Sequence, residues 1–313
     1  LLQARDPRPA RGVRGGLMAT VTAVSAPTVA GAGARFAAFS FVDRITASDA
    51  QGHARGVYTI PAGLPTFPAS LVAEATGQLA AWIAMERVGF RRRPVAALAG
   101  ETRFHAIALP GDTLDLAVDI EACDEESISY SGRASVDGRL VLELLDCLGP
   151  MLDVAEFDDP AALAADHALL AGPGAPCGRF QGVAAPPLVD TAHAAGRRLD
   201  AKLSVPAAAP FFADHFPRRP VFPATLMLDA QLRLAQRVAA EAAAAPVRLD
   251  RITNVKVRSF TPPGATLALF AERVDGATGT DIVVKVGAQI EGGEGRAVAA
   301  ARLIFTPASE GSA

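Results

Sequence analysis

Cysteine is scarce in this sequence, with three residues among 313, Cys123, Cys147 and Cys177. Their spacing fits no set of metal ligands, and their odd number fits no closed set of disulfides. Free thiols are typical of a reducing compartment, so we expect a cytoplasmic protein without a metal site.

Charge of one sign and long apolar runs are also lacking. The net charge of -3 gives no sign of nucleic-acid binding. No apolar run reaches the roughly 18 residues that a membrane helix needs. We therefore expect neither nucleic acid nor a membrane as a partner. Hydrophobic residues make up 50% of the chain, and 313 residues suit two domains.

The sequence does contain a repeat of itself. In chain order the paired segments are FVD at 41–43 and LVD at 188–190, FPASLVAEA at 67–75 and FPATLMLDA at 222–230, and LPGDTL at 109–114 and PPGATL at 262–267. Three pairs in the same order predict two similar units in one chain.

Each unit has the pattern of a long helix followed by strands. The predicted helices, 69–88 and 224–244, are free of proline and rich in alanine and leucine. The first is apolar nearly all round, which indicates burial, whereas the second has one polar face. Alternating segments broken by glycine pairs predict antiparallel strands at 113–121, 127–136, 140–145, 265–274, 280–290 and 297–305. The fold class is therefore α+β.

A loop with three prolines in seven residues precedes the second helix, in the sequence FFADHFPRRPVFP at 211–223. Proline fixes φ and has no N–H, so this loop is extended and is shaped by tertiary packing. His215 is its only ionisable ring, and an imidazole titrates near neutral pH. Asp229 follows, six residues after Pro223.

This stretch resembles the β-hydroxyacyl carrier-protein dehydratases of fatty acid synthesis, which have the hotdog fold. The resemblance is good over about residues 186–245 and fair from there to the C-terminus. The chain departs from that family at Ala224, where glycine is usual, and at Arg233, where one branch has glutamine. Asp229 in place of Glu is similar to the branch that also isomerises double bonds. The resemblance implies a double hotdog, in which two antiparallel sheets each wrap around a long central helix.

The two units differ at the residues that this resemblance marks as catalytic. Ile60 occupies the position of His215, whereas Glu74 and Gln78 keep the Glu-Ala-x-x-Gln pattern of the dehydratase helix. In homodimeric members each site combines the histidine of one hotdog with the carboxylate of the other. Carried over, this pairs His215 as base with Glu74 as acid, and leaves a degenerate site of Ile60 and Asp229. We expect one working site per chain.

Two further groups complete the predicted site. Free backbone N–H groups at a helix start stabilise a developing oxyanion, so we expect this contribution from the first residues of one helix, either Ala69 and Ser70 or Ala224 and Thr225. Arg218 and Arg219 flank the histidine. They suit contact with an acidic carrier protein or a phosphopantetheine phosphate, and equally suit a solvated surface.

The predicted function is a dehydratase that removes water from a β-hydroxyacyl thioester, carried on a carrier protein or CoA, in fatty acid, polyketide or polyene biosynthesis. No cofactor is expected beyond the phosphopantetheine that carries the substrate. Alternatives are a double-bond isomerase, a hotdog thioesterase, whose motifs lack the His-Phe-Pro loop, and a non-catalytic acyl-binding domain.

The expected organisation is a flexible leader at 1–34, a first hotdog at 35–149, a linker at 150–186 and a second hotdog at 187–308. The two hotdogs form an internal pseudo-dimer, in a chain that is itself a monomer or a homodimer.

Overall fold

The computed structural model describes residues 36, 38–274, 280–293 and 295–308, so the predicted leader at 1–34 lies outside the described residues. The first half contains β1 (Arg44–Ser48), β2 (His53–Thr59), α1 (Ala69–Arg87), β3 (Arg92–Pro94), β4 (Leu98–Phe104), β5 (Thr113–Cys123), β6 (Ser127–Val136) and β7 (Arg139–Asp153). A connection with the short 3-10 helix η1 (Val154–Glu156) and α2 (Pro160–Ala171) follows. The second half contains β8 (Leu188–Ala194), β9 (Arg198–Ser204), η2 (Pro210–Ala213), α3 (Ala224–Ala242), β10 (Val247–Val257), β11 (Thr266–Arg273), β12 (Ile282–Ile290) and β13 (Ala297–Pro307).

The two halves of the chain have the same strand order, in agreement with the repeat in the sequence. In the first half the strand order is β1-β2-β5-β6-β7-β4, and from the opposite edge the second half follows the same order as β8-β9-β11-β12-β13-β10. Neighbouring strands are antiparallel throughout the sheet, as in β5 with β6 and β11 with β12. The α+β class and the two similar units predicted from the sequence are therefore present.

The two halves share one sheet, which differs from the two separate sheets of the prediction. β4 and β10 pair antiparallel, with Ile252 opposite Thr102 and Val255 opposite Ala99, and so join the halves into a 13-stranded sheet. The sequence analysis missed both strands. Charged and polar residues are frequent in both strands, as in LAGETRF and VRLDRITNVKV, so the apolar alternation that marks a strand is weak there.

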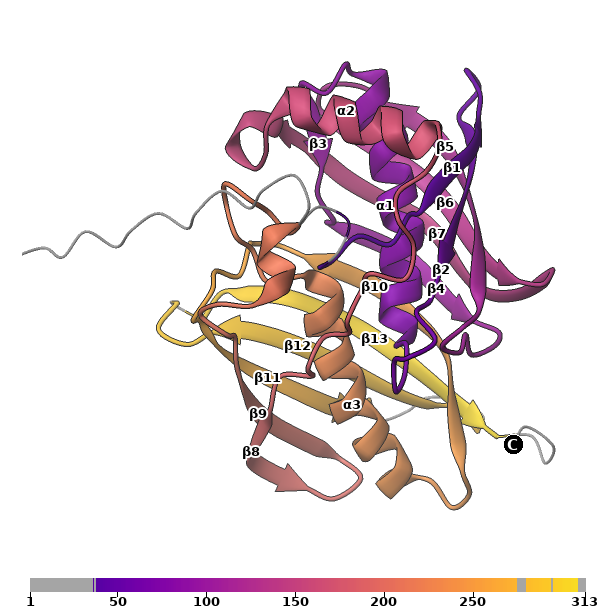
Figure 1. The fold of residues 1–313 in the computed structure, drawn as a ribbon. Coiled ribbons are helices and arrows are strands. Elements are labelled where there is room, and N and C mark those ends of the chain that lie inside the picture. The colour runs from indigo at the N-terminus through magenta and orange to yellow at the C-terminus, as the bar shows by residue number, and fades with distance from the viewer. Residues whose placement is uncertain (1–35, 37, 275–279, 294, 309–313) are drawn as a thin grey trace, which may run out of the picture.

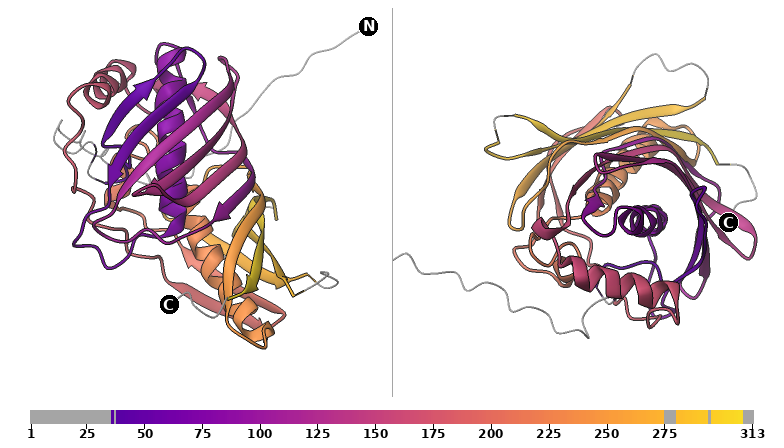
Figure 2. Two further views of the ribbon diagram at one scale, coloured as in Figure 1. Left: turned by 90° about the vertical axis from the view of Figure 1, so that its right-hand side faces the viewer. Right: turned by 90° about the horizontal axis from the view of Figure 1, so that it is seen from above.

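The two long helices lie on the concave side of the sheet (Figures 1 and 2). Seen from above, α1 is surrounded by the strands of the first half (Figure 2). Leu71, Leu79 and Ile83 are buried on it, as its nearly all-round apolar sequence predicts. α3 keeps one polar face, on which Arg237 pairs with Asp190 of β8 at 2.7 Å. Both helices end within two residues of the predicted positions.

The predicted linker begins inside β7, which continues through Gly149 to Asp153 and pairs with β3. A Cβ at Gly149 would collide with the carbonyl oxygen of Val95, so glycine here permits close strand packing rather than a break. α2 lies within the predicted linker and begins at Pro160, and the carboxylate of the preceding Asp159 caps its first turn. It contacts α1 and β1 and covers the open side of the first half (Figure 2).

In the part of the chain that the structure describes, no helix combines the length and hydropathy needed to cross a membrane.

The central position of α1 predicts a large stability loss when its buried face is truncated. Leu79 is 0% exposed, so Leu79→Ala should lower the free energy of unfolding by about 2–5 kcal/mol through lost burial and a residual cavity. Leu109, which is 57% exposed, provides the control: Leu109→Ala should change it by no more than about 0.5 kcal/mol. Urea denaturation measures both, and equal losses would contradict this arrangement.

Candidate active site

A cavity of about 280 Å³ lies between the two helices and the junction of the two half-sheets. Along α1 its lining runs from Ala73 to Met85, roughly 18 Å at 1.5 Å per residue. Along α3 it runs from Ala224 to Gln231. The cavity therefore borders both halves of the chain.

The strands contribute a row of lining residues that crosses the junction. Tyr130 of β6 is opposite Cys147 of β7, which is opposite Ala99 of β4, which is opposite Val255 of β10. Burial raises the pKa of the Cys147 thiol to about 11, so this cysteine is a protonated, weakly reactive wall residue at neutral pH. The row leaves an apolar floor with small side chains at its centre.

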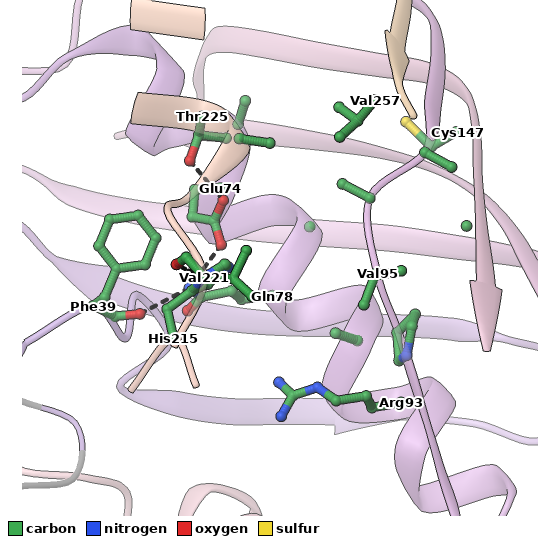
Figure 3. Close-up of a pocket in the computed structure, with 18 of the residues that line it drawn as sticks. Phe39, Glu74, Gln78, Arg93, Val95, Cys147, His215, Val221, Thr225 and Val257 are labelled. Atoms are coloured by element: carbon green, nitrogen blue, oxygen red, sulfur yellow. Dashed lines mark hydrogen bonds between the residues drawn. The ribbon is translucent and has the colours of Figure 1, made fainter. Parts of the chain in front are cut away.

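Glu74 extends from α1 toward the start of α3 (Figure 3). One carboxylate oxygen, Oε2, accepts a hydrogen bond from the Thr225 hydroxyl at 2.8 Å, and the other, Oε1, accepts one from Gln78 Nε2 at 2.9 Å. Gln78 Nε2 also donates to the Phe39 carbonyl at 3.0 Å, and Gln78 Oε1 accepts from the Phe41 N–H at 2.8 Å. These bonds fix the carboxylate at the meeting point of the two halves.

His215 follows η2 and lines the same cavity. Its Nδ1 lies 2.9 Å from the Val221 carbonyl (Figure 3). A carbonyl only accepts, so Nδ1 carries the proton of the neutral ring and Nε2 keeps a lone pair. Phe216 stacks on the imidazole at 4.1 Å, and Phe39 meets it edge-on at 5.5 Å. The ring is therefore oriented by contacts on several sides.

Burial lowers the pKa of His215 below its ordinary value, and the nearby negative charge of Glu74 opposes this shift without cancelling it. The imidazole is therefore neutral at pH 7. A neutral imidazole with a free Nε2 lone pair is the form that accepts a proton.

Asp214 holds the histidine loop against the first half, which the sequence analysis missed. Its Oδ2 accepts hydrogen bonds from the N–H groups of Ala38 and Phe39, at 3.0 and 2.8 Å, and from the Ser40 hydroxyl at 3.2 Å. The only signal in the sequence was the position of this carboxylate directly before the histidine. Its partners lie about 175 residues away, so their identity required the fold.

The structure brings together one of the two predicted combinations. His215, Glu74, Gln78, Ala224 and Thr225 all line this cavity. Its oxyanion candidates are therefore the first residues of α3. At the start of α1, Ala69 lines a second cavity and Ser70 is buried, so neither belongs to the site with the histidine. Thr225 differs from its expected role because its side chain also binds Glu74.

The second cavity is the counterpart of the first in the internal repeat. Asp229, Leu232 and Arg233 line it at the positions equivalent to Glu74, Gly77 and Gln78. Arg233 Nε lies 3.4 Å from Asp229 Oδ2, so these two side chains form an ion pair one turn apart on α3. Burial raises the pKa of Asp229, and Arg233 opposes the rise.

Ile60 is fully buried in the core and does not line the second cavity. A histidine from another position does line it. His105 follows β4 and is bound through Nε2 to Glu143 at 2.8 Å. This histidine is not part of a His-Phe-Pro loop, so the second cavity lacks the arrangement of the first.

Arg218 and Arg219 contact the connection between the halves. Arg218 pairs with Asp159 at 3.1 Å and Arg219 with Glu156 at 2.7 Å, and both side chains are about half exposed. Both therefore stabilise the histidine loop, while contact with a carrier protein remains a prediction. Among the described residues, no three His, Cys, Asp or Glu side chains are grouped as metal ligands.

Comparison with domain families identifies each half separately. The model of the FabA-like domain matches residues 35–144, and the model of the ApeI-like family, described as ApeI dehydratase, matches residues 191–288. Each half therefore matches the model of a different dehydratase-type family, and each model covers about a third of the chain. No curated protein sequence matches the chain significantly.

Two solved structures with low sequence identity and TM-scores above 0.5 share the fold. A Lactobacillus plantarum protein assigned as an oleoyl thioesterase aligns with a TM-score of 0.55 at 9% identity, over 83% of this chain and 97% of its own. The tesB protein of Mycobacterium avium subs paratuberculosis aligns with a TM-score of 0.51 at 12% sequence identity. The alignment covers 84% of this chain and 95% of that protein. The dehydratase domain of PpsC from Mycobacterium tuberculosis, in complex with C12:1-CoA, aligns with a TM-score of 0.49 at 14% sequence identity. The alignment covers 86% of this chain and 99% of that domain.

The environment of His215 predicts its titration. The pKa is lowered in the folded protein, so the unfolded chain binds more protons between the folded value and about 6.5. Stability from this group is thus present above pH 6.5 and is lost as pH falls toward the folded value.

Histidine side-chain NMR titration tests this, with His53 as an internal control. Its hydrogen bond to Asp119 raises the pKa of His53, so it should titrate above 6.5 while His215 titrates below. The reverse order would show that the His215 ring is solvated.

Proposed function

We propose that the protein dehydrates a β-hydroxyacyl thioester at one composite site, with His215 from the second half as base and Glu74 from the first half as acid. The observation that supports this most directly is that the side chains of both residues line one cavity. Two dehydratase-type family matches support the reaction class.

In the proposed reaction His215 Nε2 takes the proton from the carbon next to the thioester carbonyl. The electron pair of that C–H bond forms the C=C bond as the C–O bond at the β-carbon breaks. Glu74 enters this step in its protonated form and gives its proton to the departing hydroxyl, which leaves as water. The proton on His215 then returns to the Glu74 carboxylate through solvent. Each positioned group contributes roughly 10² to 10⁴-fold.

The start of α3 suits the negative charge that develops on the thioester oxygen. The first N–H groups of a helix have no intrahelical acceptor, and the helix dipole favours an anion there. Ala224 and Thr225 line the cavity at this end. Backbone donors held in place before the reaction cost no reorganisation when the charge appears.

The remaining polar groups position the acid. Thr225 and Gln78 each donate to a different oxygen of Glu74, which leaves little freedom for rotation of the carboxyl group. Double-bond isomerisation requires the same base and acid, so we retain it as a second activity of the same site. We also propose that the substrate is carried as a thioester of a carrier protein or of CoA, and that the reaction belongs to fatty acid, polyketide or polyene synthesis.

Three substitutions test the composite site. Turnover of a β-hydroxyacyl thioester is followed by the loss of 18 Da by mass spectrometry, the mass of one water. His215→Ala and Glu74→Gln should each lower kcat by about 10² to 10⁴-fold, because each removes one proton-transfer group. Asp229→Asn, the repeat-matched control, should keep the wild-type rate.

The opposite pattern, with Asp229→Asn inactive and Glu74→Gln active, would place base and acid in the same half. Activity unchanged in all three variants would show that another site performs the reaction.

The small floor residues give a prediction on substrate size. Ala99→Leu adds bulk between the helices and the sheet junction, so it should reduce kcat/KM for a dodecanoyl-length substrate about tenfold relative to a butyryl-length one. Ala106→Leu, at the second cavity, is the control and should leave this ratio unchanged. An unchanged ratio in Ala99→Leu would exclude the acyl chain from this floor.

A further inference from the structure

Two polar side chains in the wall of the first cavity have no assigned role. Gln231 of α3 and Thr261, in the connection between β10 and β11, are both 2% exposed and both line the cavity. Within the described residues, Gln231 Nε2 and Thr261 Oγ1 have no hydrogen-bond partner. A buried polar group without a partner costs about 1–3 kcal/mol, so each such group requires an explanation.

The internal repeat provides a comparison for each of them. The counterpart of Gln231 is Thr76, which is also fully buried, but its hydroxyl donates to the Val72 carbonyl at 3.0 Å within the helix. The counterpart of Thr261 is Ala108, which has no polar side chain and lines the second cavity. The fold therefore does not demand an unsatisfied polar group at either position. Of each repeat-related pair, the member with the unpartnered polar atom is the one that lines the cavity with His215 and Glu74.

The position of Gln231 indicates what it binds. It lies six residues after Thr225 on α3, roughly 9 Å farther along the helix axis. Thr225 marks the reacting end because its hydroxyl binds Glu74. The neighbouring lining residues Met227, Leu228 and Val255 are apolar. An amide N–H₂ in such surroundings pairs with an acceptor oxygen.

We propose that Gln231, supported by Thr261, forms a second oxygen-recognising subsite for the acyl chain of the substrate. It would select chains that carry a keto or hydroxyl oxygen well beyond the β-position over plain alkyl chains. The acyl chain is the source because Gln231 is enclosed, whereas a pantetheine arm must extend toward solvent. This inference rests on the proposed function and specifies its substrate class.

Binding of unreactive ligands tests the subsite without relying on turnover. The probes are saturated acyl N-acetylcysteamine thioesters of equal length, one plain and the others with a single keto group at successive positions. Without a β-hydroxyl group they cannot be dehydrated. Calorimetry on the wild type should give a Kd about tenfold lower for one keto position than for the plain chain, because one buried hydrogen bond is formed.

Gln231→Leu should abolish this preference while keeping the affinity for the plain chain, and Thr261→Val should reduce it. Thr76→Val, the repeat-matched control, should keep it. Equal affinities of all probes in the wild type, or a preference that survives Gln231→Leu, would overturn the proposal. Either result would show that Gln231 holds solvent or has a packing role.

Two further results separate the possible origins of a failure. If Gln231→Leu weakens binding of pantetheine without an acyl group, the recognised oxygen belongs to the carrier arm and the acyl assignment is wrong. If the wild type shows the keto preference but does not dehydrate a β-hydroxyacyl thioester, the proposed reaction fails while the subsite stands.

Discussion

The pairing of β4 with β10 is the constraint on which the rest of the structure depends. It joins the half-sheets edge to edge and so places α1 and α3 over one junction. Only in this arrangement does the hydroxyl at the start of α3 reach the carboxylate on α1, across 151 residues of sequence. An antiparallel pair at the centre also removes two exposed sheet edges, which protects each half from pairing with other chains.

The cavity exists because packing at this junction is incomplete. Elsewhere the helices contact the sheet through fully buried residues such as Leu79 and Leu234, whereas at the junction the sheet presents Ala99 and other small residues. Space bordered by both halves is the natural position for a site with components from both. The hydrogen bonds of Asp214 to residues 38–40 fix the histidine loop over this space.

Duplication of the fold allows the two halves to differ. In a symmetric pair every substitution would affect both sites, but here Glu74 and Gln78 are matched by Asp229 and Arg233, which pair with each other. The halves also differ at Gln231, whose amide N–H₂ has no partner in the described residues, and at the equivalent Thr76, whose hydroxyl donates to the Val72 carbonyl. Of these residues, Glu74, Gln78 and Gln231 all line the first cavity.

The sequence by itself determined the local elements and the candidate groups. Helix limits followed from propensity and proline positions, the two units from the repeat, and the proposed pairing of His215 with Glu74 from a family resemblance. The tertiary structure decided the single continuous sheet, the hydrogen bonds of Asp214 to residues 38–40, the Val221 contact that sets the imidazole tautomer, and the position of the start of α3, rather than that of α1, at the cavity with His215. These depend on contacts between residues far apart in the chain, where local periodicity carries no information about the partner.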